Sequence, residues 1–115
     1  MTRHAVDEMV VLQPQGDLTE GASCDELERE LMTLAERGRR VIIDLAATRV
    51  LTAHCLGLLA RAQRIASANG GRIVLCGAAG LQRWLLDVTH LADALPLFGS
   101  EQEAVRSLNA GRVVA

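Results

Sequence analysis

The sequence predicts a single α/β domain built on a mixed central β-sheet of about four to five strands, with about four helices. Short apolar runs, often β-branched, alternate with longer segments whose apolar residues recur at helical spacing. Two of the short runs, at 41–43 and 72–77, are unbroken, which is typical of strands buried on both faces of a parallel sheet. The 115 residues suit one domain, 1–115, in which about 109–115 form a loose C-terminal tail.

The N-terminal part predicts a strand followed by a helix. MVVLQPQG, at 9–16, is an apolar run that stops at a proline and a glycine, as a strand does when it enters a turn, and one extra strand fits before it. In SCDELERELMTLAERG, at 23–38, Ser23 and Glu26 have the spacing of a capping box, and Gly38 ends the helical pattern. The apolar face of this predicted helix holds Cys24, Leu27, Leu31 and Leu34.

A strand–helix–strand unit is predicted in the middle of the chain. The strands are the unbroken runs at 41–43 and 72–77, and the helix is predicted at 53–68 and ended by NGG at 69–71. Because the connection is a helix of about four turns, we expect the two strands to be parallel, with a right-handed crossover.

Two further helices and a short strand are predicted in the C-terminal third. GLQRWLLDV at 80–88 is amphipathic, LPLF at 95–98 is a short strand candidate, and SEQEAVRSLNAG at 100–111 contains a second capping box, from Ser100 to Glu103. The residues expected in the core here are Leu81, Trp84, Leu85, Val88, Phe98, Ala104, Val105 and Leu108.

Charge and composition exclude several classes of function. The formal net charge is −2 and the only aromatic residues are Trp84 and Phe98, so the chain lacks the basic stripe and stacking side chains of a nucleic-acid-binding protein. No apolar run reaches the roughly 20 residues that span a bilayer, and MTRHAVDEMV at the N-terminus lacks the apolar core of a signal peptide. We therefore expect a cytoplasmic protein with no nucleic-acid partner and no membrane insertion, either a monomer or a weak homodimer.

The adjacent His54 and Cys55, in RVLTAHCLGLLA at 49–60, raise the question of catalysis or metal binding. Neighbouring residues on a helix point about 100° apart, so His54 is badly placed to act as a base for the Cys55 thiol. His54, Cys55, Cys76 and His90 have no recognised metal-ligand spacing, and no glycine-rich phosphate-binding loop is present. The sequence thus predicts no enzyme, no metal site and no cofactor.

The three cysteines, Cys24, Cys55 and Cys76, follow no spacing typical of a disulfide framework, so buried reduced thiols are the favoured interpretation. A thiol near a helix N-terminus can have a lowered pKa and become more reactive. The predicted helix start at 53 and the end of the next strand lie at the same edge of the sheet. A redox-controlled bond between Cys55 and Cys76 is therefore a second interpretation.

The order of the elements and several strings resemble the STAS domain, the fold of bacterial anti-sigma factor antagonists. The strings are VVLQPQGDL for the leading strands, VIIDL for the central strand, LTAHCLGLLARAQRIASANGGRIVLCG for the following helix and strand, and LQRWLLDVTHLADALPLFGSEQEAV for the C-terminal third. Their order and spacing agree across nearly the whole chain. The resemblance implies a STAS-like fold and capture of an anti-sigma factor of the serine-kinase type, which frees a sigma factor for transcription.

The resemblance also locates a phosphorylation motif that this chain has lost. In phosphorylatable members the motif reads Asp-Ser-Ser/Thr-Gly, and its first serine is the target of the partner kinase. The four positions here hold Thr52, Ala53, His54 and Cys55. A second family aspartate is replaced by Thr19, whereas Leu56 and Gly57 match the positions just after the motif. Because Ala53 has no oxygen to esterify, the usual phosphoswitch cannot operate at this degenerate phosphosite.

The hydroxyl of Thr52 is better placed to cap the predicted helix than to accept a phosphate, although a phosphosite moved to Thr52 stays an alternative. His54 suits a polar position on a surface that a partner contacts. We expect this surface to consist of the loop 48–52 and the exposed side of helix 53–68. It comprises Arg49, Thr52, Ala53, His54, Gly57 and Arg61.

The function implied by the resemblance is therefore an anti-sigma factor antagonist held in its unphosphorylated form and controlled by abundance, redox state or competition. Two rival functions stay open. STAS-like proteins that lack the serine include small regulatory subunits of a phospholipid-transport ABC system, where the same surface binds the ATPase. Other STAS domains bind nucleotides, a role for which this sequence contains no positive indication.

Overall fold

The computed structural model describes residues 1–18, 22–78, 80, 87 and 95–110. Strands and helices follow one another in the order β1 (Thr2–Val6), β2 (Met9–Gln13), β3 (Gly16–Leu18), α1 (Ala22–Glu36), β4 (Arg40–Asp44), β5 (Thr48–Leu51), α2 (Ala53–Ala68), β6 (Arg72–Cys76), β7 (Leu97–Phe98) and α4 (Glu101–Ala110).

The main sheet has five strands in the order β1-β2-β4-β6-β7, and it is mixed. β1 and β2 form an antiparallel hairpin, while β2–β4, β4–β6 and β6–β7 are parallel pairs. The predicted mixed sheet of four to five strands is thus confirmed, as are the extra leading strand and the parallel unit β4–α2–β6. The short strand predicted at LPLF is β7, which pairs with the end of β6.

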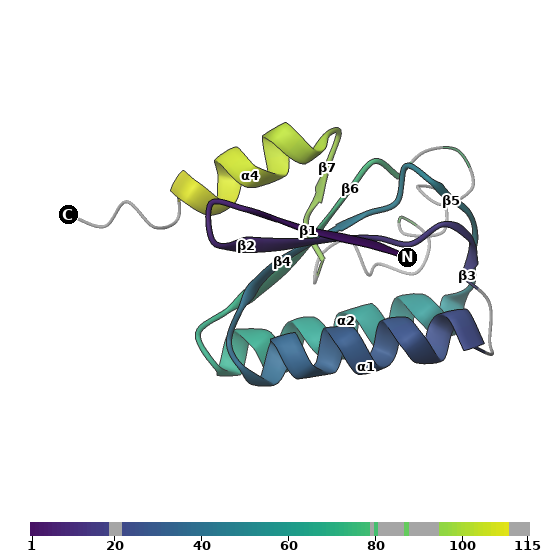
Figure 1. Cartoon of the computed structure of the whole chain (residues 1–115), viewed down its shortest axis with the longest axis horizontal. Helices are drawn as coiled ribbons and strands as arrows, with labels where there is room; N and C mark the ends of the chain where they lie inside the picture. The colour runs from purple at the N-terminus through teal and green to yellow at the C-terminus, as the bar shows by residue number, and fades with distance from the viewer. Residues whose placement is uncertain (19–21, 79, 81–86, 88–94, 111–115) are drawn as a thin grey trace.

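The helices cover both faces of this sheet, with α1 and α2 on one face and α4 on the other (Figure 1). Alternate residues of the central strands supply the two cores. Val41 and Ile43 of β4 join the larger cluster with α1 and α2, whereas Ile42 joins the smaller cluster with α4. This arrangement explains why β4 is apolar at consecutive positions, because both of its faces are fully buried.

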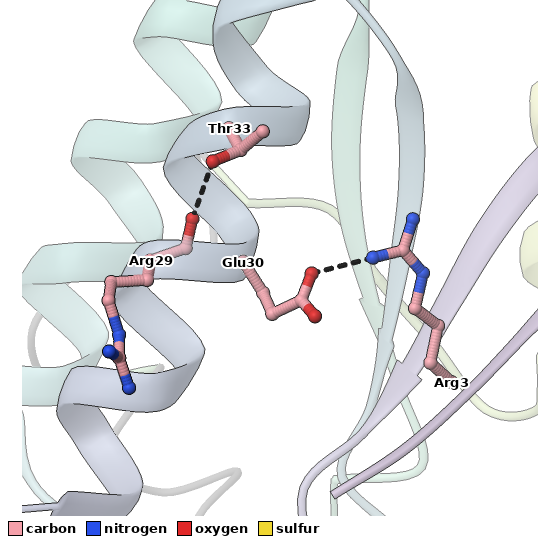
Figure 2. Close-up of polar contacts among 4 residues, drawn as sticks. All are labelled: Arg3, Arg29, Glu30 and Thr33. Carbon is pink, nitrogen blue, oxygen red and sulfur yellow. Dashed lines mark hydrogen bonds and ion pairs between the residues drawn. The ribbon is translucent and has the colours of Figure 1, made fainter.

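The apolar faces predicted for the first two helices are buried as expected. On α1, Cys24, Leu27, Leu31 and Leu34 are each at most 3% exposed. The predicted cap of this helix is wrong, because α1 begins at Ala22 and Ser23 lies inside it. Glu30 of α1 points toward β1 and forms an ion pair in which Arg3 Nη1 lies 2.6 Å from Glu30 Oε2 (Figure 2).

A second, two-stranded sheet corrects the predicted loop at 48–52. Residues 48–51 form β5, which pairs in parallel with β3. The pairing is held at one end by Thr48, whose Oγ1 donates to the carbonyl oxygen of Pro14 over 2.9 Å. The segment preceding α2 is therefore a strand paired with β3, with a shift of register between Gly16 and Asp17.

The C-terminal helix is capped by Ser100 as predicted, but the Glu103 carboxylate binds the amide of Gly99 rather than that of Ser100. The amide of Glu103 donates to Ser100 Oγ over 3.2 Å, and the Glu103 carboxylate accepts from the amide of Gly99 over 3.0 Å. Two residues of the predicted loose tail, Asn109 and Ala110, belong to α4. Phe98 packs partly buried against the smaller core cluster. Most of the predicted helix at 80–88, with Trp84, and the tail beyond residue 110 lie outside the described residues.

Candidate partner-binding surface

The start of α2 is set by backbone pairing on one side and by a side-chain cap on the other. Residue 52 follows β5 directly, and its amide donates to the carbonyl oxygen of Leu18 at the end of β3 over 3.3 Å. Thr52 has extended backbone angles (φ −92°, ψ 161°) and is the N-cap. Its Oγ1 accepts from the amide of Cys55 over 3.3 Å, so one of the unpaired donors at the helix start is satisfied. The predicted capping role of Thr52 is confirmed.

The residues after the cap alternate between the core and the surface. Cys55 and Leu56 are fully buried. Ala53, His54 and Gly57 are exposed and share the outward side of the first turns of α2. These three residues, together with Arg49, Thr52 and Arg61, are called the α2-start surface below.

Gly57 has open space around it on this surface. A Cβ atom built on Gly57 meets no heavy atom within 4 Å, apart from its chain neighbours and its own helix backbone. Packing within the chain therefore does not require a glycine here, although glycine is unfavourable in a helix interior. With the methyl side chain of Ala53 nearby, the outward side of α2 starts as a low surface that another backbone can approach closely.

Arg49 stands at the edge of the α2-start surface and is oriented by Asp17 of the neighbouring strand. Its Nε and Nη2 atoms donate to the two carboxylate oxygens of Asp17 over 2.9 and 3.1 Å. The hydrogen bond from Arg49 and the charge of its guanidinium lower the pKa of Asp17, and the hydrogen bond to Asp17 and its negative charge raise the pKa of Arg49. The Arg49 side chain is 77% exposed. The pair thus positions a guanidinium that solvent, or a partner, can reach.

Arg61 lies two turns along α2 from the cap and faces α1. Its Nη2 atom is 3.8 Å from Glu28 Oε1, and both side chains are about half exposed. An exposed pair at this distance contributes little to stability. Arg61 is therefore available at the far end of the α2-start surface.

The cysteines are not arranged as the second sequence interpretation required. Cys55 Sγ contacts Cys24 Sγ of α1 at 2.9 Å, and both thiols belong to the larger core cluster. Cys76 belongs to the smaller cluster under α4, on the other face of the sheet. A bond between Cys55 and Cys76 is thus excluded in this fold. All three thiols are free and buried, as the favoured interpretation expected.

Comparison with known proteins places this fold in a family. The family model described as "Mlab, STAS domain" matches residues 1–98. The chain belongs to the STAS domain family. No curated protein sequence is similar enough to this STAS domain to count as a match.

Solved STAS proteins share the fold over nearly their whole length. An anti-sigma factor antagonist from Mycobacterium paratuberculosis is 18% identical, with a TM-score of 0.83 over 94% of this chain and 92% of that one. An anti-sigma factor antagonist domain protein from Planctomyces limnophilus is 19% identical, with a TM-score of 0.78 over 94% and 97%. The phosphorylated form of the Bacillus cell fate determinant SpoIIAA is 19% identical, with a TM-score of 0.72 over 93% and 97%. This STAS domain therefore has the fold of anti-sigma factor antagonists.

Three residues of this region escaped the sequence analysis. Asp17 orients Arg49, and Val50 is 40% exposed beside it. The signal that could have found both is the pairing of the short strands, because Asp17 lies opposite Val50 in the register of β3 and β5. Cys24 was assigned only to the core, and its contact with Cys55 follows from how α1 packs on α2.

The groups that the α2-start surface exposes are basic, aromatic or small. They are two guanidinium groups, an imidazole, a methyl group and bare backbone, and the one hydroxyl of this surface is engaged as the helix cap. In the described part of the chain, no cluster of three or more histidine, cysteine or acidic side chains could hold a metal ion. Across the same ranges, no helix has the length and apolar content needed to cross a bilayer.

Proposed function

We propose that this STAS domain is a non-enzymatic, cytoplasmic binding module that captures an anti-sigma factor of the serine-kinase type through its α2-start surface. The observation that carries the proposal is the placement of Ala53. It is exposed and is the first residue of α2, directly after the Thr52 cap, where phosphorylatable relatives carry their target serine. In this proposal the surface binds its partner, and the hydroxyl that would switch it is missing at residue 53.

The physical effect of that missing hydroxyl is a permanent binding state. A phosphoserine at this position would add nearly two negative charges to the centre of the surface, where it can break or rebuild an interface. Alanine offers no oxygen for the transfer. The fraction of the protein that is bound to its partner then depends on the concentrations of the two proteins and of competitors, with no covalent switch at residue 53.

The shape of the surface supports binding to another protein. Ala53 and Gly57 leave room for close backbone approach, while Arg49 is held outward by Asp17 as a charged group at the edge. An oriented guanidinium loses less side-chain freedom on binding than an unrestrained one, because its rotamer is already fixed. Small groups at the centre and an oriented cation at the edge suit recognition of a protein surface.

A second candidate partner is the ATPase of a phospholipid-transport ABC system. The observation that favours it is the family match, whose description is Mlab rather than the name of an antagonist. The same α2-start surface would hold that ATPase, and the chain would then be an assembly subunit. The two candidates differ in the partner and agree on the surface.

The test is capture of partners by matched charge variants. Ala53→Asp places a carboxylate at the positive end of α2, whose first turn contains no acidic residue, so the variant should fold as well as the parent or slightly better. The control, Gln102→Asp, adds the same charge to the first turn of α4 on the opposite face of the sheet. Each tagged protein is incubated with lysate of the source organism, and the captured proteins are identified by mass spectrometry.

We expect the parent and Gln102→Asp to recover the same ATP-binding partner and Ala53→Asp to lose it. A histidine-kinase-like ATPase domain supports the sigma pathway, and an ABC ATPase supports transport. Undiminished capture by a folded Ala53→Asp would refute the surface itself.

The missing switch is tested with the purified kinase-type partner and ATP. The parent should gain no phosphate, whereas Ala53→Ser should gain one at residue 53. Phosphorylation of the parent at Thr52 would show that the site has moved and would overturn the permanent binding state.

A further inference from the structure

Two buried thiols face each other beneath the α2-start surface. Cys24 is the third residue of α1 and Cys55 the third residue of α2, and their sulfur atoms are 2.9 Å apart. The two side chains are at most 1% exposed. The two cysteines are 31 residues apart in sequence, and their thiols bring the first turns of two neighbouring helices into contact.

The geometry is close to that of a covalent bond. A disulfide has a sulfur–sulfur distance of about 2.05 Å, so the sulfurs need to approach by only about 0.9 Å. Both thiols are carried on helices that lie side by side and pack on the same sheet face (Figure 1). The pair is therefore held near bonding distance by the fold, and each thiol meets the other before any thiol from a second molecule.

We propose that Cys24 and Cys55 form an intramolecular disulfide when the protein meets a peroxide, which makes the pair an oxidative modification site that joins α1 to α2. One thiolate attacks the peroxide, the oxygen–oxygen bond breaks, and a sulfenic acid and hydroxide form. The second sulfur then displaces the hydroxyl group of the sulfenic acid. In total, two thiols and one hydrogen peroxide give one disulfide and two waters, with two electrons passing from sulfur to peroxide oxygen.

The environment makes this reaction slow at neutral pH. Burial, with the hydrogen bond and charge of Cys55, raises the pKa of Cys24 to about 12. The thiolate is the reactive form, and at pH values below the pKa its fraction increases tenfold for each unit by which the pH rises. Disulfide formation should therefore accelerate steeply with pH, which separates this site from the low-pKa cysteines of fast redox sensors.

The bond would act on the fold at the point where α2 begins. The Cys55 amide donates to Thr52 Oγ1, so a covalent link at Cys55 fixes the same turn that the cap holds. Closing a loop of this length also removes conformational freedom from the unfolded chain. This inference concerns the two helices alone and does not depend on which partner the surface binds.

The experiment exposes the folded protein to hydrogen peroxide from pH 7 to pH 9, blocks remaining thiols with an alkylating reagent after denaturation, and measures intact mass and peptide links. Cys76→Ala keeps the pair and removes the third thiol. Cys24→Ala and Cys55→Ala each remove one member, and alanine preserves a small apolar side chain at both sites. Circular dichroism confirms that each variant is folded.

We expect the parent and Cys76→Ala to lose two hydrogens per molecule, to yield a linked Cys24–Cys55 peptide, and to do so faster at pH 9 than at pH 7. The oxidised protein should melt on the order of 10 °C higher than the reduced one, and a thiol reductant should reverse the shift. Either single-alanine variant should form no intramolecular link. Free thiols throughout at pH 9, a link that includes Cys76, or separate over-oxidation of one cysteine would overturn the proposal.

Discussion

Replacing Thr52 by alanine should destabilise the protein through the loss of one specific hydrogen bond. Thr52 Oγ1 accepts from the Cys55 amide over 3.3 Å, and its own donation to the Leu18 carbonyl oxygen, at 3.5 Å, is too long to contribute much. The loss of an N-cap acceptor lowers the free energy of unfolding by about 1 kcal/mol. For a chain of this length that corresponds to a fall in Tm of about 4 °C.

Two further substitutions at Thr52 isolate the cause. Thr52→Val keeps the shape and the β-branch but removes the acceptor, so its loss should match that of Thr52→Ala. Thr52→Ser keeps the acceptor and should stay close to the parent. Urea unfolding monitored by circular dichroism measures the free energy of unfolding of each variant. If the dependence of this free energy on urea concentration is the same in all variants, the substitutions leave the unfolded state unchanged. Parental stability of both the alanine and the valine variants would refute the capping argument, and an equal loss in the serine variant would assign the effect to the methyl group.

Three other outcomes follow from the same structure. Gly57→Ala should raise the free energy of unfolding by about 0.5–1 kcal/mol in urea unfolding, because alanine favours the helix and its Cβ meets open space. Gly38→Ala should lower the free energy of unfolding by about 3 kcal/mol, because Gly38 has a positive φ of 64° and the added Cβ would collide with a carbonyl oxygen at the end of α2. Gly70→Ala, at φ 84° with open space around the added Cβ, should lower the free energy of unfolding by only about 1 kcal/mol. Arg49→Gln should raise the pKa of Asp17 toward its ordinary 3.8, because the lowered pKa comes from Arg49, and a carboxyl NMR titration measures this change. In the parent, the ion pair is fully formed above about pH 4 and is lost as the pH falls through the pKa of Asp17.

The parts of the fold that sequence could predict are those with a strong local pattern. The unbroken apolar run of β4, which contains Ile42, predicts burial on both faces of the strand, and the helical spacing of apolar residues predicts α1 and α2. The residue pattern did not predict β5, and it indicated β3 only through the resemblance of GDL to the family's leading strands, because strands of three and four residues have almost no pattern of their own. Both strands form because Gly16–Leu18 and Thr48–Leu51 pair with each other in the folded chain. Asp17 was missed for the same reason.

The error over the cysteines has a different cause. The prediction that Cys55 and Cys76 share one edge of the sheet rests on a correct βαβ unit, but sharing an edge does not mean sharing a face. Side chains alternate along β6, so Leu75 enters the core with α2 and Cys76 enters the core with α4. The strand period of two residues, applied to Leu75 and Cys76, was the signal that could have separated them.

Neighbouring residues at the start of α2 have different structural roles, and this difference explains why the side chain of residue 53 can vary without damage to the fold. Thr52 caps the helix, and Cys55 and Leu56 enter the core, so these three positions are constrained by folding. Ala53 lies between them on the outside, where its side chain is exposed and the fold needs no particular group. A serine or an alanine at residue 53 is thus nearly neutral for stability. An effect of Ala53→Asp on partner capture, or of Ala53→Ser on phosphorylation, is therefore measured separately from any effect on folding.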